Sequence, residues 1–148
     1  MNKPGFVYVT YIATTPEKLW NALVDGEATR QYWRHENVSD WKVGSTWEHR
    51  KSDGDVGKVD VVGKVVESVP PKRLVVTWGR PHEAAETAKH SRVTFEIEPS
   101  GPTVRLVVTH DQLEADPDMA RAVSGGWPKV LSNLKSLLET GRPMPNFW

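Results

Sequence analysis

The segment that decides the fold is GGWPKVLSNLKSLLETG at residues 125–141. Its apolar side chains recur at steps of three and four residues, which is the spacing of a single helix face. They are Trp127, Val130, Leu131, Leu134, Leu137 and Leu138. Pro128 near the start and Gly141 after the end suit the two termini of a helix. An apolar stripe of this kind is stable only when another apolar surface covers it.

That surface is predicted by the alternating pattern upstream. Period-two runs predict strands near 46–50, 58–69, 73–79, 91–98 and 103–110, after a β-branched and aromatic strand at 6–12. Between the first two strands, Thr15 and Pro16 begin one short helix, and residues 27–33 form a second. We therefore expect an α+β domain in which a six-stranded antiparallel sheet packs on a long C-terminal helix.

Length and composition narrow the class of protein. A chain of 148 residues suits one domain, 1–148. Its 19 basic and 19 acidic residues give no net charge, which argues against nucleic acid as a partner. It has no cysteine, which excludes disulfides, thiolate metal sites and a cysteine nucleophile. Because no apolar run approaches the roughly 20 residues of a membrane span, we expect no stable membrane insertion and a cytoplasmic protein.

Six segments, in this order, resemble the START-like (SRPBCC) superfamily, and within it the branch named after the activator of heat-shock protein 90 ATPase homologue. They are IATTPEKLWNALVD at 12–25, RQYW at 30–33, SDWKVGSTW at 39–47, ESVPPKRLVVTW at 67–78, SRVTFEIEPSG at 91–101, and the segment quoted first. The resemblance implies a helix-grip fold, in which a curved sheet grips the C-terminal helix. It also implies a mostly apolar cavity between them.

The function that this resemblance implies is non-catalytic binding of a small hydrophobic or aromatic molecule, such as a lipid, a polyketide or a flavonoid-like compound. Two alternatives stay open. A cyclase or hydratase acting in the same cavity needs an inward-facing polar pair, such as His110 with His49. A protein-interaction role like that of the co-chaperone needs an exposed apolar or charged patch. We expect a monomer or a weak homodimer, and leave open whether the tail PMPNFW packs on its own chain or on a partner.

Motifs for catalysis, metals and cofactors are missing from the sequence. The five histidines, His35, His49, His82, His90 and His110, form no HExxH pattern and no helical pair at i and i+4. The sequence has no GxSxG motif for a serine nucleophile and no GxxxxGK[ST] loop for phosphate. We expect no metal, no cofactor and no catalytic residue.

Candidate ligand contacts come from the tryptophans and from the predicted inner face. Trp33, Trp41 and Trp47 flank an irregular segment that the fold would place near the cavity mouth, where large rings could wall an apolar ligand. Alternation puts His110 inward at a strand end, where it could bond a polar ligand group, and His49 could join it. The whole expected set is Trp33, Trp41, Trp47, His49, Trp78, Phe95, Leu106, His110, Trp127, Leu131 and Leu134.

Overall fold

The computed structural model describes residues 5–114 and 116–145 of the chain. The last residues of the PMPNFW segment, 146–148, lie outside the described residues. The elements follow the order β1 (Phe6–Ile12), α1 (Pro16–Val24), α2 (Gly26–Trp33), β2 (His35–Val38), β3 (Thr46–Lys51), β4 (Val59–Val69), β5 (Arg73–Trp78), β6 (Ser91–Ser100), β7 (Thr103–Asp111) and α3 (Pro117–Thr140). Two single-turn 3₁₀ helices, η1 (Pro81–Glu83) and η2 (Thr87–Lys89), lie between β5 and β6.

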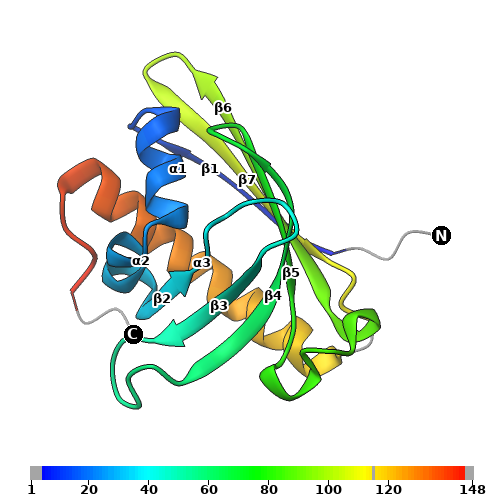
Figure 1. Ribbon diagram of the computed structural model, residues 1–148. Coiled ribbons are helices and arrows are strands. Elements are labelled where there is room, and N and C mark those ends of the chain that lie inside the picture. The colour runs from blue at the N-terminus through cyan, green and yellow to red at the C-terminus, as the bar shows by residue number, and fades with distance from the viewer. Residues whose placement is uncertain (1–4, 115, 146–148) are drawn as a thin grey trace.

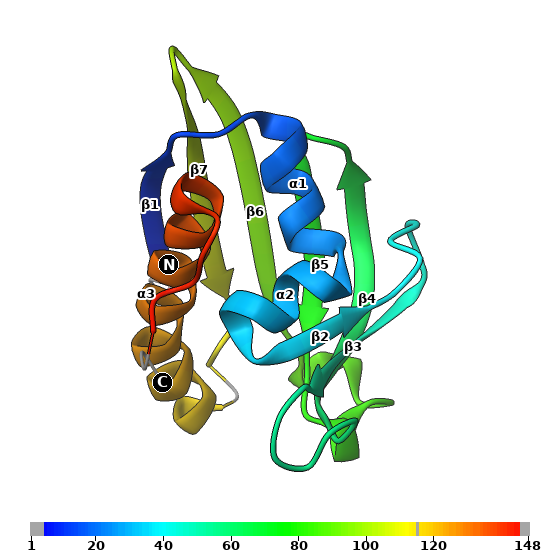
Figure 2. The same ribbon diagram turned by 90° about the vertical axis from the view of Figure 1, so that its left-hand side faces the viewer.

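The strands form one curled antiparallel sheet in the order β1-β7-β6-β5-β4-β3-β2. All three α-helices of the described chain lie on one side of it, and the opposite side carries no α-helix of the described residues (Figure 1). Figure 2 shows α3 running along β1 and β7, whereas α1 and α2 cover the middle of the sheet. The expected α+β class and the long C-terminal helix are confirmed.

The sheet has seven strands in the described chain rather than the expected six. The additional strand is β2, which pairs His35 with Lys51 and Val38 with Glu48 on β3. Its four residues, HENV, are mostly polar and too few to show an alternating pattern. Pairing with β3 therefore creates this strand, and local propensity does not.

Helix α3 begins well before the expected start. Asp116 caps it, accepting a hydrogen bond from the backbone N–H of Met119 at 3.0 Å, and 24 residues follow. Gly125, Gly126 and Pro128 thus lie inside the helix, where each glycine costs about 1 kcal/mol and proline about 3 kcal/mol relative to alanine. Burial of apolar side chains along its inner face, Val123, Trp127, Val130, Leu131 and Leu134, outweighs that cost.

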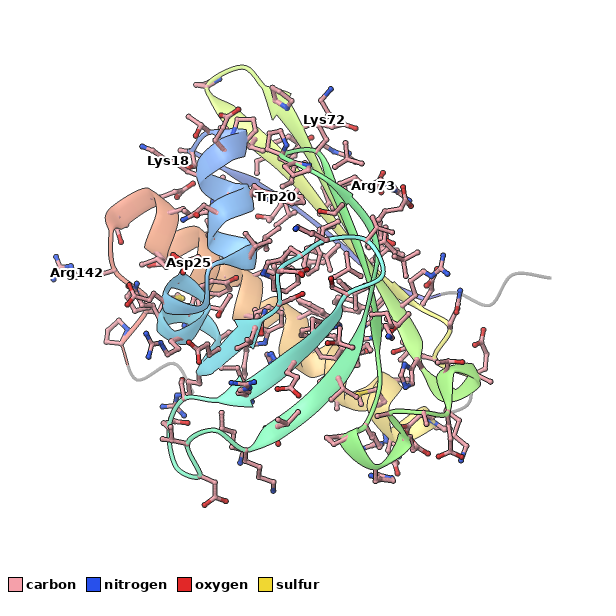
Figure 3. The ribbon with its side chains drawn as sticks, in the orientation of Figure 1. Lys18, Trp20, Asp25, Lys72, Arg73 and Arg142 are labelled. Carbon is pink, nitrogen blue, oxygen red and sulfur yellow. The ribbon has the colours of Figure 1, made fainter. Side chains whose placement is uncertain are left out.

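The core fills the space between the helices and the inner face of the sheet. Leu74, Val93 and Leu106 from the sheet are at most 2 % exposed, as are Leu131 and Leu134 from α3. Trp20 on α1 is half-buried and points toward the sheet (Figure 3). Charged residues occupy the outer face: Arg73, on the far side of the sheet in Figure 3, pairs there with Glu67 at 3.2 Å and Glu96 at 3.1 Å.

Candidate ligand-binding cleft

A cleft of about 310 Å³ opens between the first half of α3 and the strands at the β2 edge of the sheet. Its walls come from the end of α2, from β2 to β5, and from α3. The lining residues are Trp33, His35, His49, Asp60, Val61, Trp78, Met119, Ala122, Val123, Gly126, Trp127 and Val130. Most of these side chains are apolar, and three are ionisable, which is the usual make-up of a small-molecule site.

The wall formed by α3 follows directly from helical periodicity. Trp127 and Val130 belong to the stripe that predicted the helix, and Met119, Val123 and Gly126 continue it upstream. Toward the C-terminus the stripe carries leucines that fill the core, whereas here it includes small residues. A Cβ added at Gly126 would meet nothing within 4 Å, so the missing side chain leaves space in the cleft. The same face of α3 therefore packs in the core near its C-terminus and lines the cleft in its first half.

Three indole rings form the aromatic wall. The ring centroids of Trp33 and Trp127 are 5.2 Å apart, those of Trp78 and Trp127 5.7 Å, and those of Trp33 and Trp78 6.3 Å. They come from α2, β5 and α3, and each ring is at most 8 % exposed. Rings packed against one another in this way present a rigid apolar surface to a ligand at low conformational cost.

A pair of stacked histidines supplies the polar part of the wall. His35 and His49 lie face to face, with ring centroids 3.9 Å apart. His35 is bonded at both ring nitrogens, donating from Nδ1 to the carbonyl of Trp33 at 3.0 Å and pairing through Nε2 with Asp60 at 2.9 Å. His49 donates from Nδ1 to the side-chain oxygen of Asn37 at 2.5 Å.

His49 is an electrically neutral ring in this setting. Burial, and then the nearby charge of His35, hold the pKa of His49 well below its usual value of about 6.5. Because Nδ1 carries the proton that Asn37 accepts, Nε2 of the neutral ring has a free lone pair. No hydrogen-bond partner for Nε2 is present in residues 5–114 and 116–145.

His110 does not line the cleft. It is fully buried at the end of β7, where Trp127 Nε1 donates to its Nδ1 at 3.0 Å. Its Nε2 then donates to Ser91 Oγ at 2.7 Å, and Ser91 donates to the carbonyl of Trp78 at 3.2 Å. Burial lowers the pKa of His110 to about 4, and both of its nitrogens are used within the protein.

The other residues that the sequence predicted as ligand contacts also fall into two groups, those that line the cleft and those that do not. Trp33, His49, Trp78 and Trp127 line the cleft, whereas the remaining residues do not. Trp41 and Trp47 contact each other, with ring centroids 6.3 Å apart, and the Trp47 indole donates to the carbonyl of Thr77 at 2.8 Å. The last group, Phe95, Leu106, Leu131 and Leu134, packs in the core.

Sequence reasoning missed His35 and Asp60 as cleft residues. His35 belongs to the strand that the pattern did not reveal, and Asp60 is a single acidic residue within the strand β4. The α3 residues upstream of Trp127 were missed because the helix was expected to start there. Helical spacing back from Trp127 to Val123 and Met119 was the one signal that could have found them.

Two further findings concern metals and membranes. In the described part of the chain, no three His, Asp or Glu side chains are grouped closely enough to hold a metal ion. No described helix is long and apolar enough to cross a membrane.

A family model described as "Activator of Hsp90 ATPase homolog 1-like protein" matches residues 13–139. No curated protein matches the sequence.

Solved structures share the fold at low sequence identity. CalU16 from Micromonospora echinospora is 19% identical with a TM-score of 0.72, over 95% of this chain and 77% of that one. The Aha1 dimer from Colwellia psychrerythraea is 21% identical with a TM-score of 0.75, over 94% and 98%. DynU16, a protein of the dynemicin biosynthetic locus, is 17% identical with a TM-score of 0.77, over 95% of this chain and 49% of that one.

Proposed function

Since the chain belongs to the Activator of Hsp90 ATPase homolog 1-like family, a branch of the START-like superfamily, we propose that it binds a small hydrophobic or aromatic molecule without transforming it. The observation that carries this proposal is the cleft of about 310 Å³ walled by Trp33, Trp78 and Trp127. Burying apolar ligand surface there provides about 25 cal/mol per Å² of driving force.

The cleft is also large enough to need an explanation. The apolar side chains that line an open cleft of this size stay in contact with water when it is empty, which costs free energy. Here two glycines stand inside α3, and one of them, Gly126, borders the cleft. Each glycine inside the helix costs about 1 kcal/mol of stability relative to alanine. A helix that bears this cost beside an apolar cleft is consistent with a cleft that a ligand occupies.

A larger side chain at Gly126, which would fill part of the cleft, tests whether the cleft binds the ligand. We expect Gly126→Leu to abolish ligand binding, because the new side chain would occupy the space beside Trp127. Binding to the unaltered protein is measured by thermal shift and tryptophan fluorescence with flavonoids, phenols and long-chain fatty acids. A ligand at about 100 times its Kd adds about 2.7 kcal/mol of stability, which raises the melting temperature by roughly 5–10 °C in a domain of this size.

Gly125→Leu is the matched control. Gly125 lies one position earlier in α3, is exposed and does not border the cleft, and a Cβ there also meets nothing within 4 Å. Both substitutions improve helix propensity by a similar amount, so only the variant at residue 126 should lose binding. Equal binding by both variants, or no thermal shift with any compound of the panel, would contradict the proposal.

The enzyme alternative receives less support from the geometry. The polar pair named above as an example, His110 with His49, is not brought together, and the polar pair at the cleft is His35 with His49 instead. The rings of His110 and His49 each pack against Trp78, at 5.4 Å and 5.6 Å between centroids. Because His110 is bonded within the core, only His49 of these two lies at the cleft.

An interaction surface is available on the edge strand β1, where Val7, Val9 and Tyr11 are 58, 44 and 48 % exposed. The Colwellia relative is a dimer, and we propose that this chain is a monomer that self-associates weakly through β1.

We expect Val9→Lys to remove any concentration dependence of the sedimentation coefficient. Val56→Lys, at a loop valine that is 74 % exposed, is the control. Self-association that survives Val9→Lys would place the contact elsewhere.

A further inference from the structure

Building on the proposed function, we infer that the ligand carries a hydroxyl group on an apolar, aromatic body, and that this hydroxyl donates its hydrogen bond to Nε2 of His49. The site is the wall of the cleft where His49 meets Trp33 and Trp78, with ring centroids 4.9 Å and 5.6 Å from the imidazole. An apolar cavity alone does not determine which polar group of a ligand is recognised, whereas a hydrogen-bonding side chain in its wall does.

The tautomer of His49 determines whether the recognised group of the ligand donates or accepts the hydrogen bond. The side-chain oxygen of Asn37 can only accept, so Nδ1 of His49 must be the protonated nitrogen. The ring is 4 % exposed and borders the cleft, and its Nε2 has no partner in the described residues. Nε2 is not one of the fully buried polar atoms that lack a partner, so it is open to the cleft, and a ligand O–H bonded to it gains about 0.5–1.5 kcal/mol net.

Among the other polar groups of the cleft, Asp60 also favours a ligand donor, whereas Trp78 favours an acceptor. Both nitrogens of His35 and the indole N–H of Trp127 are already bonded within the protein. The carboxylate of Asp60 is a further acceptor, so it too favours a donor. Trp78 has a buried indole N–H without an acceptor in the described chain. A hydroxyl can accept as well as donate, which an ammonium group cannot.

His49 binds the hydroxyl and does not remove its proton. Burial and the adjacent His35 keep the pKa of His49 low, so the ring is a weak base at neutral pH. A weak base can accept a hydrogen bond from a phenol without becoming charged in an apolar wall. The role is therefore recognition of the ligand.

The test compares two probes that differ in donor capacity. 2-Naphthol can donate from its hydroxyl, whereas 2-methoxynaphthalene presents the same ring system and an oxygen that can only accept. We expect the unaltered protein to bind 2-naphthol about tenfold more tightly, which corresponds to one net hydrogen bond. Kd values are measured by tryptophan fluorescence, with naphthalene as the purely apolar reference.

Two substitutions assign the preference to His49. In His49→Asn the amide nitrogen can still donate to Asn37, because it occupies the place of Nδ1, but no acceptor remains at the position of Nε2. In His49→Gln the amide group reaches the position of Nε2 and supplies an acceptor there. We expect the preference for 2-naphthol to disappear in His49→Asn and to be retained at least in part in His49→Gln.

The outcomes separate the two proposals. If all three probes bind and the ratio of Kd values is the same in the unaltered protein and in His49→Asn, cavity binding stands and the hydroxyl inference is wrong. Should neither variant fold, equal or tighter binding of 2-methoxynaphthalene by the unaltered protein also overturns the inference, whereas tighter binding of 2-naphthol supports it. If no probe binds, cavity binding and the hydroxyl inference both fail.

Discussion

Replacing Leu134 with aspartate is expected to yield insoluble or molten protein. Leu134 is fully buried on the inner face of α3, in the layer shared with the sheet. An unpaired carboxylate there costs several kcal/mol, which is comparable to the roughly 5–15 kcal/mol that stabilises a whole domain. Expression yield, near-ultraviolet circular dichroism and dye binding to exposed apolar surface would show the loss of fixed packing.

The control is Lys129→Asp, which places the same residue on the exposed side of the same helix. We expect it to change stability by less than about 1 kcal/mol, since surface substitutions seldom do more. A Leu134→Asp protein that melted together with the control would show that α3 does not grip the sheet as described.

Acidification is expected to remove about 3 kcal/mol of stability through His110. Its folded pKa is about 4 against 6.5 for the free side chain, so below pH 6.5 the unfolded chain binds more protons than the folded one. The contribution is complete above pH 6.5 and is lost progressively as the pH falls to about 4, at about 1.36 kcal/mol for each unit of pKa shift. Urea unfolding measured at pH values from 7.5 to 4 gives the curve.

Burial of the ring lowers the pKa of His110 and so causes that loss, and the bond from Trp127 also suits a neutral ring. A proton on Nδ1 of His110 would face the indole N–H that now donates to it at 3.0 Å. His49, whose pKa is also lowered, adds to the effect with the same sign.

His110→Phe is the variant that isolates the titration. It should be less stable at pH 7.5 by about 1–3 kcal/mol, because the Trp127 N–H loses its acceptor and Ser91 loses a donor. Its stability should then fall less steeply between pH 6.5 and 4. An acid limb as steep as that of the parent would mean that His110 is not the titrating group.

The sequence by itself was sufficient for the α+β class and for the long helix on an antiparallel sheet, but not for the seventh strand, β2. The stripe from Trp127 to Leu138 and the alternation of Val93, Phe95 and Ile97 are local periodicities, and each states which face of its element is buried. Two apolar faces in a chain of this length must cover each other, so the helix on the sheet follows. The family was recognisable for the same reason, because its characteristic segments are capping, turn and packing signals.

The tertiary structure alone decided the site. His35 reaches the cleft on a strand that exists only because β3 pairs with it, and the start of α3 depends on burial that outweighs two glycines and a proline. The alternating pattern correctly predicted that the side chain of His110 points inward. The ring lies in the core, hydrogen-bonded to Trp127 and Ser91, and does not line the cavity. The periodicity of apolar residues in the sequence shows which face of a helix or strand is buried. Whether a buried polar group meets another side chain or an open space depends on partners 17 or more residues away, which only the folded chain brings together.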